Sequence, residues 1–309
     1  MNLNPSNQLI LFGHHTEFQN FSNLFFNQKL PNKILLSGEK GIGKSTLAYH
    51  LVNYVLSSDE DLSYDIKNFV INTENKSFKL IINKSNPNFI SIDINDDKKS
   101  IDINQIRNLI ITLNKSSFNK KPRFVLIDNI ELLNINSVNA LLKILEEPND
   151  NIYFILINNN KKILPTLKSR CLNFKIQLSS SQSLDITNQI LNDNFMNLIN
   201  EDLINYYSTP GKILNLLDFA NQNDLDLKEI NLKELIKKII MEKKYKKDSS
   251  IKYLLYSLIE IYFRKNISIK NTKLINIHNY FLKKINNTKI FNLDDESLLM
   301  EFDERVLDG

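Results

Sequence analysis

One glycine-rich octapeptide, Gly38–Ser45 (GEKGIGKS), constrains the fold of this chain more than any other feature. The 309 residues contain only 6 glycines, and three of them, Gly38, Gly41 and Gly43, lie in this segment. The apolar run Ile34–Leu36 precedes the segment, and a pattern with apolar residues on one helical face follows it. A strand, a tight loop and a helix in this order predict a phosphate-binding loop.

Each residue type in the octapeptide has a chemical reason to be there. Glycines let the backbone adopt positive φ angles and approach phosphate oxygens closely. Successive N–H groups and the N-terminus of the next helix then face the anion. Lys44 is expected to reach the β- and γ-phosphates, Ser45 to bind Mg²⁺, and Thr46 to complete the nucleotide site. A chance glycine turn before a helix is the competing interpretation, and the strand–loop–helix context disfavours it.

A second acidic position follows the apolar strand Phe124–Ile127, which ends in Asp128. Together with the phosphate loop, Asp128 is predicted to be the second Mg²⁺ element. The next residue is Asn129, whose amide can orient a water but cannot accept its proton at neutral pH. Glu131 lies two residues further on, and alternation at a strand end does not fix its direction. The pattern predicts a site that binds MgATP and cleaves it poorly.

Short apolar strands alternate with amphipathic helices in the first half of the chain, which indicates an α/β fold with a parallel sheet covered on both faces. Asp102 or Ser100 is expected to cap a helix that runs to Leu113. The expected strands, besides the one before the phosphate loop, are 89–94, 124–127 and 152–157, with a hairpin around 69–71 and 80–82. After residue 177 the pattern is helical throughout. We therefore expect an α/β domain at 1–177, a small helical lid domain at 178–222 and an all-helical C-terminal domain at 223–309.

Composition excludes several classes of protein. The only cysteine is Cys171, so neither a disulfide framework nor a cysteine-based zinc site is possible. No apolar run is long enough for a membrane span and the N-terminus has no signal-peptide pattern, so we expect a cytoplasmic protein. The net charge of +4 permits an acidic partner without requiring one. The basic run Lys243–Lys247 fits a phosphate-backbone contact or a solvated helix end, and the lysine-rich composition favours the second.

Two further motifs give the sequence a family resemblance. Asn139–Pro148 reads NALLKILEEP, and Leu164–Cys171 ends in Ser-Arg-Cys. With these, the chain resembles bacterial DNA polymerase III clamp-loader subunits of the AAA+ class, most of all the delta-prime subunits. The matching stretches occur in family order over roughly residues 10–175, and they are Leu11–His14, Leu30–Pro31, Gly38–Thr46, Phe124–Leu133, Asn139–Pro148 and Leu164–Cys171.

The resemblance assigns roles to single residues. It implies that Arg170 is an arginine finger for the ATP bound by a neighbouring subunit, and that Asn158, or the adjacent Asn159, senses the γ-phosphate. Gly211 stands where an ATP-hydrolysing subunit has arginine, and Lys212 compensates only in part. The resemblance also implies ATP and Mg²⁺ as cofactors. Residues 57–88 lack the four cysteines of the zinc module found in many delta-prime subunits, so zinc is not expected.

The resemblance also implies a function. The chain is expected to be a largely structural ring member that binds ATP, hydrolyses it poorly and helps to load the sliding clamp onto primed DNA. Its helical C-terminal domain would act as an oligomerisation collar. The expected partners are delta-like and gamma- or tau-like subunits, with the clamp and primer-template DNA reached through the complex, and no membrane. The alternatives are an ATP-hydrolysing, gamma-like motor subunit, another replication or repair ATPase, and an unrelated P-loop kinase.

Overall fold

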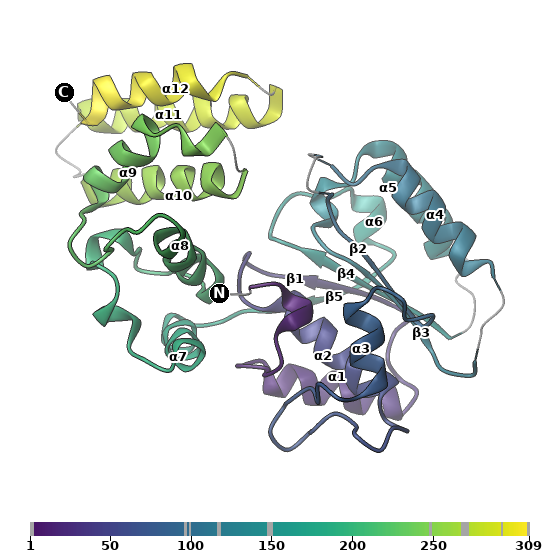
Figure 1. Cartoon of the computed structure of the whole chain (residues 1–309). Coiled ribbons are helices and arrows are strands. Elements are labelled where there is room, and N and C mark those ends of the chain that lie inside the picture. The colour runs from purple at the N-terminus through teal and green to yellow at the C-terminus, as the bar shows by residue number, and fades with distance from the viewer. Residues whose placement is uncertain are drawn as a thin grey trace. The chain divides into compact units, whose positions relative to one another are not determined.

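The computed structural model describes residues 3–95, 98, 100–115, 119–146, 151–246, 249–266, 272–291 and 293–307 (Figure 1). The chain divides into two compact units. The first comprises the residues up to Ile186 together with the short segment Thr209–Gly211, and the second comprises Thr187–Ser208 and the residues from Lys212 onward. The phosphate loop and the segment Thr209–Gly211 therefore belong to the same unit.

A parallel sheet of five strands, in the order β2-β3-β4-β1-β5, is the centre of the first unit. The strands are β1 (Lys33–Ser37), β2 (Phe89–Ile92), β3 (Arg123–Ile127), β4 (Ile152–Asn158) and β5 (Leu172–Lys175). Because the strands are parallel, all five carboxyl ends lie at one edge of the sheet. β4 separates β1 from β3, so the residues after β4 lie between the phosphate loop and the end of β3.

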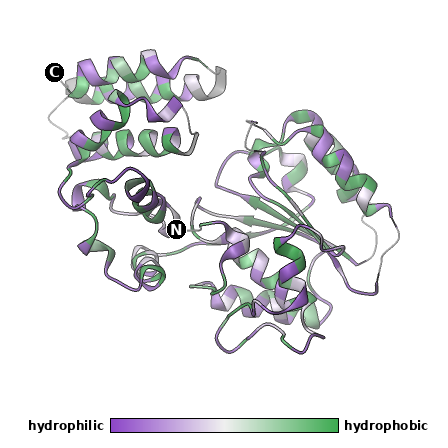
Figure 2. Ribbon diagram, in the orientation of Figure 1, coloured by the Kyte–Doolittle hydropathy of each residue, from purple (hydrophilic) through white to green (hydrophobic). Residues whose placement is uncertain are grey.

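Helices cover both faces of the sheet, which confirms the predicted α/β layering (Figure 1). One face carries α1 (His15–Phe26), α2 (Lys44–Leu56) and α3 (Lys76–Ile82), and the other carries α4 (Ile103–Leu113) and α5 (Ile135–Glu146). A short helix, α6 (Pro165–Lys168), precedes β5. The strands β1, β3 and β4 at the centre of the sheet are its most continuously apolar segments (Figure 2). Their side chains on the second face pack against α4 and α5, and this core includes Val125, Phe154, Ile106, Leu109, Leu141 and Leu145.

Local side-chain chemistry explains where the helices start. Asp102 and Gln105 form a capping box at α4, so the helix predicted to follow Asp102 is confirmed. The Asn134 side chain accepts a hydrogen bond from the Ser137 N–H at 2.9 Å at the start of α5. Pro148, the last residue of the Asn139–Pro148 motif, lies outside the described residues.

The predicted hairpin around residues 69–71 and 80–82 is wrong. Residues 76–82 form α3, because the Asn75 side chain accepts a hydrogen bond from the Phe78 N–H at 2.6 Å and caps the helix. Val70 makes only isolated bridges to Ile10 and Asp65. The segment does contain the apolar residues on which the prediction rested, but the Asn75 cap before it favours a helix over a strand.

The second unit is helical, as predicted: the described residues after β5 contain no strand. Its helices are α8 (Pro210–Gln222), which begins within the first unit, α9 (Leu232–Met241), α10 (Ser249–Asn266), α11 (Thr272–Phe291) and α12 (Asp295–Phe302); α7 (Ser180–Leu191) spans the division between the units. Phe263, Phe281 and Phe302 contact one another in its core, with ring centroids 5.3–6.2 Å apart. None of the described helices is both long enough and apolar enough to span a membrane.

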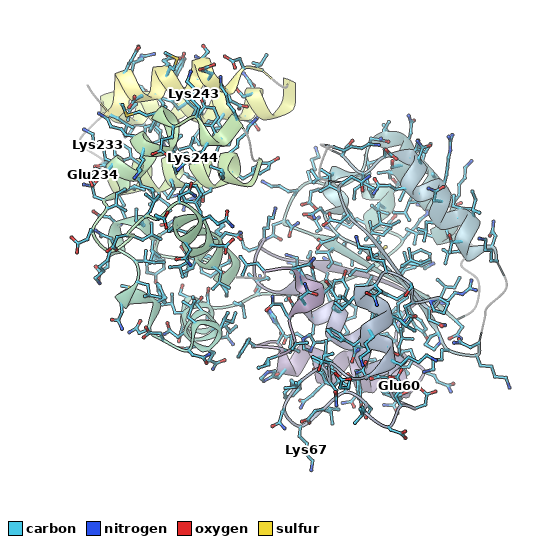
Figure 3. The ribbon with its side chains drawn as sticks, in the orientation of Figure 1. Glu60, Lys67, Lys233, Glu234, Lys243 and Lys244 are labelled. Atoms are coloured by element: carbon cyan, nitrogen blue, oxygen red, sulfur yellow. The ribbon has the colours of Figure 1, made fainter. Side chains whose placement is uncertain are left out.

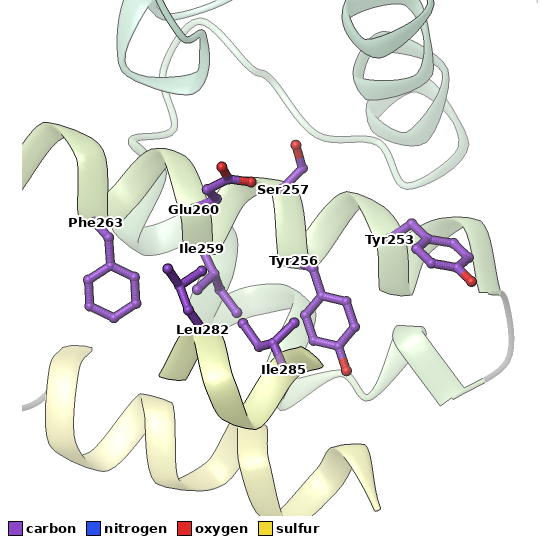
Figure 4. Close-up of a pocket in the computed structure, with 8 residues that line it drawn as sticks. All are labelled: Tyr253, Tyr256, Ser257, Ile259, Glu260, Phe263, Leu282 and Ile285. Atoms are coloured by element: carbon purple, nitrogen blue, oxygen red, sulfur yellow. The ribbon is translucent and has the colours of Figure 1, made fainter. Parts of the chain in front are cut away.

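A small pocket lies between α10 and α11 in this unit (Figure 4). Its lining is mainly aromatic and aliphatic, with Glu260 and Ser257 as polar members. Tyr253 and Leu282 are exposed at its rim.

Candidate nucleotide site

The phosphate loop connects β1 to α2 and depends on its glycines for two different reasons. Gly41 and Gly43 have φ angles of +86° and +94°, which L-residues rarely adopt. Gly38 has an ordinary φ, but a Cβ there would lie 2.2 Å from the carbonyl oxygen of Ile176. Gly43 is also the N-cap of α2, so the loop leads directly into a helix N-terminus.

Lys44, the first residue of α2, is buried against the loop, with only 3% of its surface exposed. Its ammonium donates hydrogen bonds to the carbonyls of Gly38 (2.9 Å) and Glu39 (2.6 Å) and to Oδ1 of Asn159 (3.0 Å). Burial lowers the pKa of Lys44 to about 8, against the nearby Asp128 and Glu131 carboxylates, which raise it. The Lys44 ammonium thus binds to the loop carbonyls, and the oxygens of a bound phosphate would replace these carbonyls as its partners.

Ser45 and Asp128 meet at the edge of the sheet, where the Ser45 hydroxyl donates a hydrogen bond to Asp128 Oδ2. Burial raises the pKa of Asp128, while the Ser45 hydrogen bond lowers it. A hydroxyl and a carboxylate are hard oxygen donors, and Mg²⁺ in nucleotide sites takes few protein ligands besides waters and phosphates. The pair therefore fits the expected Mg²⁺. Thr46 is half-buried in the first turn of α2.

The two asparagines at the end of β4 have different surroundings. Asn158 caps the following turn: its amide donates to the Lys161 carbonyl at 2.9 Å and accepts from the Lys161 N–H at 2.9 Å. Asn159 is the one in contact with Lys44. Both were considered from the sequence, and the structure places Asn159 rather than Asn158 beside the loop lysine.

A polar network extends from Asn159 to the end of β3. The Asn159 amide donates to Asn129 Oδ1 and to Glu131 Oε1, both at 2.9 Å, and its N–H donates to Glu131 Oε2 at 3.3 Å. Asn129, at φ +53°, donates to Asp93 Oδ1 at 2.7 Å. The Glu131 direction left open by the sequence is thus toward the site. Asp93 was missed, although its place directly after β2, at the same edge of the sheet, was a usable signal.

Arg170 lies in the turn after α6, on the surface of the first unit. Its guanidinium donates to the Thr166 carbonyl at 3.0 Å and pairs with Glu146 of α5 at 2.5 Å. The side chain remains about one-third exposed. Burial raises the pKa of the next residue, Cys171, to about 11, so its thiol is protonated at neutral pH.

Gly211 contacts the phosphate loop through its backbone. Its N–H donates a hydrogen bond to the Gly41 carbonyl at 2.9 Å. A Cβ at Gly211 would lie 2.7 Å from Gly41 Cα, so an arginine at this position would displace one of the two backbones. Lys212, the neighbouring cation considered from the sequence, belongs to the other unit.

The described lysines of the basic run are paired with acidic residues of their own unit. Lys243 and Lys246 pair with the two carboxylate oxygens of Glu296 at 2.6 and 2.5 Å, and Lys244 pairs with Glu242. Figure 3 labels Lys243 and Lys244 within the helical unit. Lys243 and Lys246 lower the pKa of Glu296 to about 2. Lys247 lies outside the described residues. The pairing supports a structural role for the run over a phosphate-backbone contact.

A phosphate loop after β1, an acidic residue after β3 and polar side chains after β4, all at one edge of a parallel sheet that is followed by helices, define a protein of the AAA+ P-loop class. Comparison with known proteins identifies the family. The family described as DNA polymerase III, delta subunit matches residues 13–180, more than half of the chain, and this chain belongs to it.

Individual relatives agree with this family. DNA polymerase III subunit delta′ of Buchnera aphidicola (subsp. Schizaphis graminum) is 28% identical over 276 residues, 84% of this chain and 80% of the relative. Subunit gamma of the same organism is 33% identical over 217 residues, 67% of this chain and 57% of its own length. Subunit delta′ of Pseudomonas aeruginosa is 31% identical over 138 residues, 44% of this chain and 40% of the relative. The predicted similarity to delta-prime subunits is confirmed.

Among solved structures, a DNA polymerase III gamma subunit-related protein from Thermotoga maritima aligns with 94% of this chain and 97% of its own, at 18% identity and a TM-score of 0.48.

Proposed function

We propose that this chain is a delta-prime-type subunit of a bacterial clamp loader, that it binds MgATP and hydrolyses it poorly, and that it contributes Arg170 to the nucleotide site of a neighbouring subunit. The cytoplasm is the proposed location, where the complex would load the sliding clamp onto primed DNA. The observation that carries the proposal is the contact of Ser45 with Asp128 beside Lys44, in a chain of this family.

The residues at the edge of the sheet supply the binding chemistry. Lys44 would exchange the Gly38 and Glu39 carbonyls for phosphate oxygens, and the helix N-terminus at Gly43 would add its partial positive charge. Ser45 and Asp128 would hold Mg²⁺, which neutralises phosphate charge when bound. Asn159, which accepts a hydrogen bond from Lys44, would lie next to the terminal phosphate.

Poor hydrolysis follows from Asn129. The residue after Asp128 carries an amide that donates to Asp93, and an amide cannot accept a proton from an attacking water. The site would therefore keep nucleotide bound and use it to fix the conformation of the subunit, while hydrolysis takes place elsewhere in the ring.

Arg170 suits a role in a neighbouring site because it is on the surface and permanently charged. Its partner Glu146 is itself exposed, so separating the ion pair costs little free energy. A planar guanidinium can then contact a phosphate charge developing in another subunit.

Co-purification tests the assembly. The chain is co-expressed with gamma- and delta-type subunits of the same genome, and the product is analysed for stoichiometry and bound nucleotide. We expect a stable hetero-oligomer with nucleotide on this subunit. A free monomer with rapid ATP turnover would contradict the proposal.

Arg170→Ala tests the finger, with Lys168→Ala, an exposed basic residue of α6, as the matched control. In the reconstituted loader we expect Arg170→Ala to reduce DNA-stimulated ATPase by about 10³-fold, the lower end of the range for arginine fingers, and Lys168→Ala to leave it unchanged. Equal activity of the two variants would refute the role.

A motor function is the second candidate, and Glu131 is the observation that favours it. Its carboxylate lies within the site network, two hydrogen bonds from Lys44 through Asn159. Appreciable turnover by the purified chain, abolished by Glu131→Gln, would support that function over the structural one.

A further inference from the structure

Three consecutive main-chain carbonyls of the phosphate loop accept hydrogen bonds from residues distant in the sequence, all in the same compact unit. The three bonds are Thr209 Oγ1 to Lys40 at 2.9 Å, the Gly211 N–H to Gly41 at 2.9 Å, and His14 Nε2 to Ile42 at 2.6 Å. Thr209 is completely buried and His14 is 6% exposed, so neither donor has water as a ready alternative.

These bonds fix the direction of the loop amides. In a planar trans peptide the carbonyl of one residue and the N–H of the next point to opposite sides. With the carbonyls of residues 40–42 tied to surrounding protein, the N–H groups of residues 41–43 face the other side. The positive φ angles of Gly41 and Gly43 give this stretch the backbone conformation of an anion-binding nest.

The contact between the two segments is too close for side chains. A Cβ at Gly41 would lie 2.7 Å from Thr209 Oγ1, and a Cβ at Gly211 would lie 2.7 Å from Gly41 Cα and 3.0 Å from the Gly41 carbonyl oxygen. Two of the few glycines in this chain are therefore placed where these backbones touch.

We propose that Thr209 and Gly211 are positioning residues of the phosphate loop, which they hold in its anion-binding form before a ligand arrives. The proposal rests on the proposed nucleotide function and extends it to a segment about 170 residues downstream. The ligand class is a nucleoside di- or triphosphate, recognised through its phosphates. On binding, Lys44 gives up its two carbonyl partners, whereas the carbonyls of residues 40–42 keep theirs.

Substitutions at Thr209 provide the first test. Thr209→Val removes the donor at nearly constant volume, and Thr209→Ser keeps it. Thr288→Val is the matched control, because Thr288 is a buried threonine that donates to the Lys284 carbonyl at 2.9 Å in α11. Affinities for MgADP and for magnesium pyrophosphate are measured by calorimetry on the full chain. Pyrophosphate has no base or sugar, so it reports on the loop alone.

We expect Thr209→Val to weaken both ligands by about fivefold, the effect of one lost hydrogen bond. Thr209→Ser and Thr288→Val should stay close to the unaltered chain. Gly211→Ala should weaken both by about tenfold or more, because its Cβ displaces the Gly41 backbone. Unchanged pyrophosphate affinity in Thr209→Val would overturn the proposal.

A second measurement does not depend on ligand. Hydrogen exchange of the amides at residues 41–43 is followed in the ligand-free chain, and we expect it to accelerate in Thr209→Val but not in Thr288→Val, at comparable melting temperatures. Unaltered exchange in Thr209→Val would overturn the positioning role. Failure of the unaltered chain to bind MgADP would instead contradict the proposed nucleotide function, with the exchange data still deciding the role of Thr209.

Discussion

Lys44 makes nucleotide affinity depend on pH. Its pKa of about 8 means that it is mostly protonated at pH 7 and loses its proton as the pH rises through 8. Phosphate oxygens favour the protonated ammonium, so binding above pH 8 must take up a proton. We expect MgADP affinity to fall by up to about tenfold per pH unit above 8, measured by calorimetry in buffers of different ionisation enthalpy. A flat profile from pH 7 to 9.5 without proton uptake would contradict this.

Asn129 can be tested by restoring a base. We expect Asn129→Glu to raise single-turnover ATP hydrolysis by about 10²-fold, the lower range for a positioned general base. Asn129→Gln, equal in length to glutamate but without basicity, is the control. If both variants hydrolyse ATP at the same rate, the missing carboxylate at position 129 does not limit the reaction.

Which residues could be predicted depended on how their direction is fixed. Lys44, Ser45 and Asp128, which the sequence predicts to act in one site, lie together at one edge of the sheet, because a loop between a strand and a helix leaves them little freedom. The choice between Asn158 and Asn159 depended on a turn in which Asn158 binds Lys161. Such local side-chain bonds leave no periodic signal in the sequence.

Helix α2 carries a buried histidine that links it to neighbouring segments. His50 Nε2 donates to the Gln8 carbonyl at 3.0 Å, and Nδ1 accepts from the Tyr64 hydroxyl at 2.9 Å. Nδ1 can accept only when the ring is neutral. Burial lowers the pKa of His50 to about 4.

This histidine predicts loss of stability in mild acid. The folded-state pKa lies below the unfolded value of about 6.5, so the unfolded chain binds more protons between pH 6.5 and 4. The stabilisation is complete above pH 6.5 and falls by up to about 3 kcal/mol as the pH drops to 4. Urea denaturation at a series of pH values measures this, and we expect a shallower dependence in His50→Gln. An unchanged slope in that variant would assign the effect to other groups.

Elements were predictable where their pattern was strong. The buried strands β1, β3 and β4 and the capped helix α4 have continuous or periodic apolar residues. β5 was missed because it is a four-residue edge strand with an exposed–intermediate–intermediate–exposed burial pattern. α3 was misassigned because its seven residues are too few for helical periodicity to exceed a strand pattern.

The division of the chain into two compact units predicts where ligand stabilisation appears. A ligand at 100 times its Kd stabilises the state that binds it by about 2.7 kcal/mol. We expect saturating MgADP to slow hydrogen exchange in α2 and the sheet and to leave α10–α12 unchanged, measured by mass spectrometry on the full chain. Equal protection of both units would mean that nucleotide binding stabilises the whole chain.

Oligomerisation belongs to the chain as a whole, and the proposed hetero-oligomer depends on surfaces that the sequence marks poorly. The basic run Lys243–Lys247 was considered as a contact and disfavoured from composition, and its described lysines are paired with Glu242 and Glu296. Charge density along the chain is therefore a weak guide to partners when acidic residues from another helix lie next to it.

The backbone contact between Gly41 and Gly211 has a consequence for recombination. Consider chimeras between this subunit and a relative that carries arginine at the position of Gly211. Whether such a chimera folds correctly at the phosphate loop depends on where the crossover falls. If both segments come from one parent, the contact is preserved. A crossover between them joins a loop shaped for glycine to a side chain that it cannot accommodate, so the two positions are exchangeable only as a pair.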